Sequence, residues 1–320
     1  MRQILFVFLS LPFMMLSAQH RTTPATQSQE LGKVRWYRSY DQAAQQASKQ
    51  DKPILILFQE VPGCATCRNY GHDVLTHPLM VEAIEQEFIP LAIFNNKGGE
   101  DARILKRYGE PSWNNPVVRI VDQQGKNLVK GVAGNYSAQG LFQAMKTVLA
   151  EQKREIPPYM HLLGEELFAA QHGQVEETYF SMYCFWSGEG HLGQAKGVLA
   201  TEPGFMGGRE VVKVTYDKQI TSTDALTTHA QQAQCSPIRK SQGYRPDKDP
   251  QYYLKHSDYK YLPLTDLQKT KINSALGQRK SPDVYLSPTQ NVWLRQIRQS
   301  KIQKKVLYTQ EFASAWYQVK

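Results

Sequence analysis

The sequence has few cysteines, no internal repeat and no long apolar run beyond its first twenty residues. Four cysteines in 320 residues are too few for a small scaffold held together by disulfides. We find no low-complexity tract and no repeated motif. Hydrophobic residues make up 41% and charged residues 21%, which excludes disorder throughout and allows a hydrophobic core. The length predicts a chain of about two domains.

Acidic residues are scarce in the last quarter of the chain. Residues 239–320 contain 16 Lys and Arg against 6 Asp and Glu, a net charge of +10, whereas the whole chain carries +9. The basic residues are spread out, and no nucleic-acid-binding motif accompanies them. We therefore expect a solvated basic face rather than a nucleic-acid partner.

The first eighteen residues have the form of a secretory signal peptide. Arg2 precedes an apolar run over 4–16, and Leu16-Ser17-Ala18 is an acceptable cleavage site. The run is shorter than the roughly 20 residues that a membrane-spanning helix needs. No cysteine follows it, which argues against a lipid anchor; an uncleaved N-terminal anchor is the alternative. We expect a periplasmic or secreted protein without stable membrane insertion.

A cysteine pair follows the first buried strand. Residues 53–58 and 88–95 are continuous apolar runs, typical of strands covered on both faces, and helical spacing precedes and follows each strand. Cys64-Ala65-Thr66-Cys67 stands directly after the first strand, so Cys64 is predicted at a helix N-terminus, where the N–H groups stabilise a thiolate. This placement favours a redox pair. A static disulfide, or half of a zinc site with His72 or His77, are the alternatives, although the histidine spacing is poor.

This stretch resembles thioredoxin over residues 34–152. Asn115-Pro116, directly before the strand predicted at 117–121, matches the cis-proline position of that fold, so Pro116 is expected beside the dithiol. Gly63 stands where the family has tryptophan, and Ala65-Thr66 replaces the usual central dipeptide, which leaves the reduction potential open.

A second region, residues 175–238, resembles peptide-methionine (S)-S-oxide reductase. The resemblance rests on four motifs in the family's order: Cys184-Phe185-Trp186 with Glu189 downstream, Gly197-Val198 with Thr201, Gly204-Phe205-Met206-Gly207-Gly208, and the strand from Val211 to Tyr216-Asp217. It implies that Cys184 attacks the sulfoxide sulfur and becomes a sulfenic acid, which a second thiol converts to a disulfide. Phe185 and Trp186 are then expected to hold the S-methyl group.

The region departs from that family at three points, one of which is that Gln234-Cys235-Ser236-Pro237 stands in place of the family's substrate-binding His-Asp-Pro region. The segment that supplies the catalytic glutamate is shortened to Arg209-Glu210, so Glu189 or Glu210 is the candidate acid. Phe205 replaces a tyrosine that bonds the sulfoxide oxygen. Cys235, at the end of a predicted helix, is either the resolving thiol or the partner of Cys184 in a structural disulfide.

The predicted fold class is α/β: a thioredoxin-like fold, a methionine sulfoxide reductase-like α+β domain and a helical basic C-terminal segment. The predicted boundaries are a signal peptide over 1–18, a leader over 19–33, domains over 34–152 and 175–238 with a linker over 153–174, and an extension over 239–320.

We expect a thiol oxidoreductase without cofactor or metal, in which the Cys64/Cys67 dithiol reduces Cys184. The expected partners are oxidised protein or peptide substrates and an upstream membrane thiol reductant. The alternatives are a general thiol–disulfide exchange protein whose second domain only binds its target, and a metal-handling protein.

Overall fold

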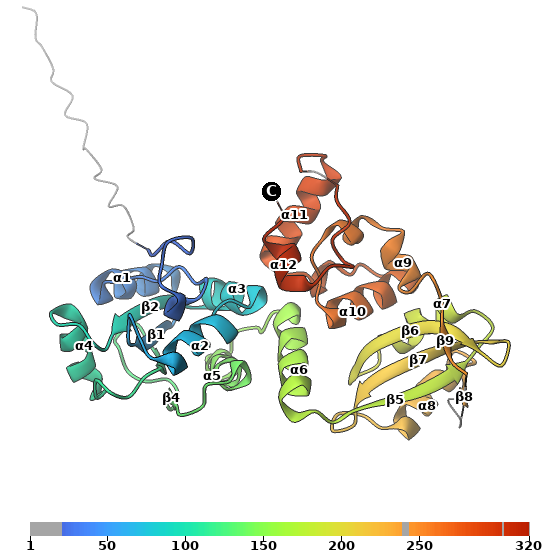
Figure 1. The fold of residues 1–320 in the computed structure, drawn as a ribbon, viewed down its shortest axis with the longest axis horizontal. Helices are drawn as coiled ribbons and strands as arrows, with labels where there is room; N and C mark the ends of the chain where they lie inside the picture. The colour runs from blue at the N-terminus through green and yellow to red at the C-terminus, as the bar shows by residue number, and fades with distance from the viewer. Residues whose placement is uncertain (1–20, 239–242, 303, 320) are drawn as a thin grey trace, which may run out of the picture.

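The computed structural model describes residues 21–238, 243–302 and 304–319. Two β-sheets with their helices form the two halves of the molecule, α6 stands between them, and a helical C-terminal unit lies next to both (Figure 1). The predicted signal peptide lies outside the described residues. In the part of the chain that is described, no helix has the length and apolar character needed to cross a membrane.

The first sheet has the strand order β2-β1-β3-β4, with β1 parallel to β2 and antiparallel to β3. Ile54 and Ile56 face a core with α1 and α4, whereas Leu55 and Leu57 face a second core with α2, α3 and α5. Every residue of β1 is buried because both faces are covered, which accounts for its continuous apolar run. The elements are α1 (Tyr40–Gln50), β1 (Ile54–Gln59), α2 (Ala65–Asp73), α3 (Pro78–Glu87), β2 (Ile89–Phe94), α4 (Glu100–Tyr108), β3 (Val117–Val121), β4 (Val132–Ala133) and α5 (Ala138–Glu151).

The described part of the predicted leader belongs to this first half. The Gln27 side chain donates hydrogen bonds to the carbonyls of Gly32 and Val34 at 2.8 and 3.0 Å, and η1 (Gln29–Leu31) follows. Glu30 and Leu31 are each only 2% exposed. The prediction of a loose leader over 19–33 is therefore wrong from residue 21 onward, because this segment packs against the domain.

The predicted linker over 153–174 consists mostly of a helix, α6 (Pro158–His172). Tyr159, Met160 and Leu163 are buried in the same core as α3 and α5. The first half of the molecule supplies the surface that buries these side chains. The prediction of a linker is corrected accordingly: α6 is fixed to the first half.

The second sheet is antiparallel, with the order β8-β5-β7-β6-β9. Gly207 and Gly208 have φ values of +57° and +74° and make the tight turn between β6 and β7, a conformation that favours glycine. Helices α7 and α8 pack against the sheet around Phe180, Val212 and Val214. The elements are β5 (Val175–Ser181), α7 (Phe185–Leu192), β6 (Val198–Met206), β7 (Arg209–Asp217), α8 (Thr223–Gln231), β8 (Ser236–Ile238) and β9 (Arg245–Pro246).

The C-terminal extension is a folded unit with a core of its own, built around Leu262, Ile272 and Leu294. Its elements are α9 (Tyr252–Lys255), η2 (Asp258–Tyr261), α10 (Asp266–Gly277), η3 (Asp283–Tyr285), α11 (Pro288–Arg298) and α12 (Phe312–Trp316). Lys271 is buried and its ammonium donates to the carbonyls of Gly193 and Ala195. The expected basic extension is thus also a structural support for the second sheet.

Candidate active site

The first thiol pair lies at the start of α2. Cys64 is the N-cap residue and is exposed, whereas Cys67, one helical turn further, is 0% exposed. Both are free thiols, and their sulfurs are 3.7 Å apart. A small movement would therefore bring the sulfurs to bonding distance.

The two thiols differ in acidity. The backbone N–H of Cys67 points to the Cys64 sulfur and lowers the pKa of Cys64 below its ordinary value. Burial raises the pKa of Cys67 to about 11. A thiolate is the nucleophile in disulfide exchange. These acidities and exposures suit Cys64 to attack a disulfide and Cys67 to resolve the mixed disulfide that would form on Cys64.

Gly63 explains why this turn lacks the tryptophan of the family pattern. A Cβ atom at Gly63 would lie 2.3 Å from the Glu60 carbonyl oxygen and 2.7 Å from the Cβ of Cys67. The N–H of Gly63 donates to the carboxylate of Glu30 at 2.8 Å. The close approach of the chain before Cys64 thus requires glycine, and a residue from the predicted leader fixes it.

The loop before β3 contacts the dithiol. The Asn115–Pro116 peptide bond is cis, Pro116 is buried, and the Cys67 thiol donates to the Asn115 side-chain oxygen at 2.6 Å. Trp113, two residues earlier in this loop, is 80% exposed. A large exposed indole in the loop that contacts the dithiol is suited to contact with a protein partner. Sequence reasoning missed Asn115 and Trp113 as site residues.

Cys184 is the N-cap residue of α7 and is half-buried. The Glu210 carboxylate accepts the N–H of Phe185 at 2.8 Å, so this carboxylate occupies the helix end next to Cys184. A cavity of about 360 Å³ opens beside it, lined by Ser181, Met182, Tyr183, Arg209, Glu210, Gln234 and Ser236. Of the two candidate acids, Glu210 is the one that contacts the helix end next to Cys184.

Aromatic rings surround the start of α7. Phe185 meets Phe205 edge to face at a centroid distance of 5.3 Å. Trp186 stacks on Tyr252, from α9, at 4.1 Å and 17°. The C-terminal unit therefore supplies a ring to the predicted substrate-binding group, a contact that no local sequence pattern could have indicated.

Glu189 is buried at 0% exposure and has its own partners. Its carboxylate accepts the Gln251 N–H at 3.1 Å and the Thr201 hydroxyl at 3.4 Å. Burial raises the pKa of Glu189 to about 8. The structure thus gives this side chain a role in joining α7 to α9, and a catalytic role for it stays a prediction.

Cys235 is 2% exposed and lies in the core of the second sheet, and burial raises its pKa. Cys184 and Cys235 are both free thiols. The pairing of Ser181 with Ser236 places Cys235 directly before β8, the strand next to β5, and β5 leads to Cys184. A resolving role for Cys235 stays a prediction.

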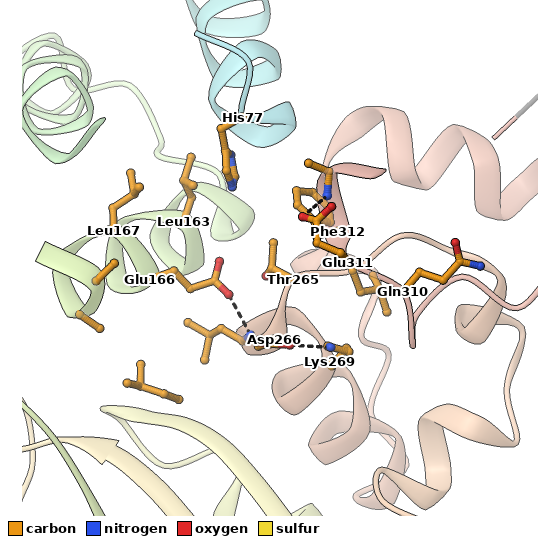
Figure 2. A pocket seen from close by; sticks show the side chains of 16 residues that line it. His77, Leu163, Glu166, Leu167, Thr265, Asp266, Lys269, Gln310, Glu311 and Phe312 are labelled. Atoms are coloured by element: carbon orange, nitrogen blue, oxygen red, sulfur yellow. Dashed lines mark hydrogen bonds and ion pairs between the residues drawn. The ribbon is translucent and has the colours of Figure 1, made fainter. Parts of the chain in front are cut away.

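The two thiol centres are in different halves of the molecule. Figure 1 shows α2 in one half and α7 in the other, with α6 between them. A further cavity of about 550 Å³ lies at the junction of α3, α6, α10 and α12. Figure 2 shows His77, Glu166 and Phe312 around it; none of the four cysteines is among its lining residues. This cavity belongs to neither thiol centre.

Comparisons with known proteins find similarity to a thioredoxin-like family and to a methionine sulfoxide reductase. The family model described as Thioredoxin-like matches residues 35–123. Residues 35–123 form a thioredoxin-like domain. The peptide methionine sulfoxide reductase MsrA of Methanococcus maripaludis (strain C7 / ATCC BAA-1331) is 38% identical over 69 residues, which cover 16% of this chain and 44% of that protein. The chain thus spans less than half the length of this relative.

The MsrA match contains a gap. The aligned stretch of 69 residues includes 16% of the 320 residues of this chain, or about 51, so about 18 aligned positions belong to the relative alone. A solved structure titled DsbH Oxidoreductase is also similar, with a TM-score of 0.31 and 16% identity over 38% of this chain and 90% of that one. The thioredoxin-like domain and its dithiol support a thiol–disulfide oxidoreductase.

Proposed function

We propose that the protein is an exported oxidoreductase that reduces disulfides in proteins or peptides. The observation that carries this proposal is the exposed Cys64 at the start of α2, 3.7 Å from the buried Cys67. Reduced Cys64, as a thiolate, attacks one sulfur of the substrate disulfide and releases the other as a thiol. Cys67 then loses its proton and attacks the Cys64 sulfur. The second substrate thiol leaves, and Cys64–Cys67 becomes a disulfide.

Each cycle passes two electrons and two protons to the substrate. An upstream thiol reductant, expected at the membrane, returns the Cys64–Cys67 disulfide to the dithiol. Trp113 offers an apolar contact for the substrate chain next to the Asn115–Pro116 loop. Asn115 holds the thiol of Cys67 until that thiol is deprotonated.

Reduction of insulin disulfides tests this proposal. Wild-type protein, Cys64→Ser and Cys184→Ser are compared with the same reductant. We expect Cys64→Ser to lose the activity. Cys184→Ser should keep it, because α7, which begins after Cys184, lies in the other half of the molecule. Full activity in Cys64→Ser would exclude this centre as the site of exchange.

A second function, reduction of methionine sulfoxide at Cys184, is favoured by the MsrA match and by the aromatic rings around α7. Cys184 attacks the sulfoxide sulfur, the oxygen passes to the cysteine, and the products are methionine and a Cys184 sulfenic acid. A thiol then forms a disulfide with Cys184 and releases water. Glu210, which lies at the start of α7, supplies the proton for the oxygen when its side chain is protonated.

Turnover of peptide methionine-(S)-sulfoxide with dithiothreitol tests this second function. We expect activity in the wild type, none in Cys184→Ser and a strong decrease in Glu210→Gln. If the wild type binds the peptide but does not turn it over, this region instead binds substrates that the thioredoxin-like domain reduces.

A further inference from the structure

Three metal-binding side chains converge at the dithiol. A carboxylate oxygen of Glu60 and the sulfurs of Cys64 and Cys67 all lie within 4.8 Å of one another. Glu60 directly follows β1 and is half-buried, Cys67 is buried, and Cys64 is open to solvent. We propose that Glu60, Cys64 and Cys67 bind one Zn²⁺ ion when the dithiol is reduced. This proposal rests on the proposed function in assuming that the dithiol cycles between two redox states.

The spacing of the sulfurs suits a tetrahedral ion. Zinc–sulfur bonds of about 2.3 Å at a tetrahedral angle place two thiolates about 3.8 Å apart. The sulfurs of Cys64 and Cys67 are 3.7 Å apart without any ion, so they need almost no movement to bind zinc. A zinc-bound carboxylate oxygen lies about 3.5 Å from each sulfur. The Glu60 oxygen, within 4.8 Å of both, reaches this position through a shift of about 1 Å.

The donor set selects the kind of metal. Two thiolates and one carboxylate, with a fourth position left for water, form a ligand set that zinc accepts. Cuprous ion prefers soft sulfur ligands and gains little from a carboxylate. The fourth position faces solvent because Cys64 is exposed. We therefore assign the site to Zn²⁺ and expect no contribution of Glu60 to binding of Cu⁺.

Zinc and disulfide formation exclude each other at this site. Binding replaces the thiol protons of Cys64 and Cys67 with the metal, whereas oxidation joins the two sulfurs and removes both thiolates. Zinc thus blocks the attacking sulfur and protects the reduced dithiol from oxidation. Release of the ion restores the exchange activity.

Calorimetric titration of Zn²⁺ into fully reduced protein tests the proposal. We expect one ion per chain in the wild type and in Cys184→Ser, and none in Cys64→Ser. Glu60→Gln should weaken the dissociation constant at least tenfold, with no change for Cu⁺. Glu151→Gln, an exposed carboxylate at the end of α5, is the matched control and should bind as the wild type does.

A second measurement needs no variant. X-ray absorption of the zinc-loaded wild type should give two sulfur ligands and two oxygen ligands at the metal. Four sulfur ligands, or equal zinc affinity in Glu60→Gln and Glu151→Gln, would overturn the three-residue site. Insulin reduction by the wild type in a chelator is measured in parallel. Activity without zinc binding rejects the metal site alone, and zinc binding without activity rejects the proposed function alone.

Discussion

The unequal acidity of the two thiols predicts a large difference in their alkylation rates. With a pKa of about 11, Cys67 is a thiolate in about 0.1% of molecules at pH 8, whereas a thiol of pKa 9.0 is ionised in about 10%. Cys64 is exposed and its pKa is lowered, so more than about 10% of it is thiolate at pH 8. We expect iodoacetamide to modify Cys64 at least about 100 times faster than Cys67 at pH 8.

The assay is a timed alkylation of the reduced protein followed by mass spectrometry. Both cysteines fall in one tryptic peptide that ends at Arg68, so fragment ions must separate the two positions. Between pH 8 and 10 the Cys67 rate should rise about 100-fold, whereas the Cys64 rate levels off. In denaturant the two rates should converge. Equal rates in the folded protein would refute the division into an attacking and a resolving thiol.

Three further outcomes are expected. Gly63→Ala should cost about 1–3 kcal/mol of stability because its Cβ would lie 2.3 Å from the Glu60 carbonyl oxygen, and an unchanged thermal midpoint would contradict this. Trp113→Ala should slow insulin reduction several-fold and leave reduction of a small aromatic disulfide unchanged; equal loss on both substrates would argue against a docking role. The raised pKa of Glu189 means that folding favours its protonated form. The stability of the wild type should therefore fall relative to that of Glu189→Gln as the pH rises from about 5 to 8, by about 4 kcal/mol at most. Urea denaturation of both proteins across this pH range measures the difference.

The chemistry of the thioredoxin-like domain could be predicted because it follows from local order. A strand buried on both faces requires a continuous apolar run, and the helix after it begins where the chain turns, at Cys64. The cis peptide bond at Asn115–Pro116 was also expected from the resemblance. Glu60 could also have been singled out from the sequence as a candidate metal ligand, since it lies between the first strand and Cys64.

The rest depends on contacts between distant residues, which periodicity does not record. Glu30 meets Gly63 from a segment whose polar composition indicated a leader. Tyr252 meets Trp186 from the predicted C-terminal extension, whose sequence indicated no contact with the second domain. The helix α6 is only weakly amphipathic, and packing of Tyr159 into the core of the first half of the molecule stabilises this helix. In each case tertiary packing decided the structure.

The packing also changes the argument for electron transfer within one chain. A flexible linker would give the two thiol centres a high effective concentration, but α6 is packed into the first core. The C-terminal unit adds bonds to both halves, from the Thr289 N–H to Glu82 at 2.6 Å and from the Lys271 ammonium to the Gly193 carbonyl at 2.9 Å. A spacer that cannot close the gap reduces the effective concentration toward zero. We therefore expect that any electrons passing from Cys64 to Cys184 travel through a second molecule or a small thiol, and not directly within one chain.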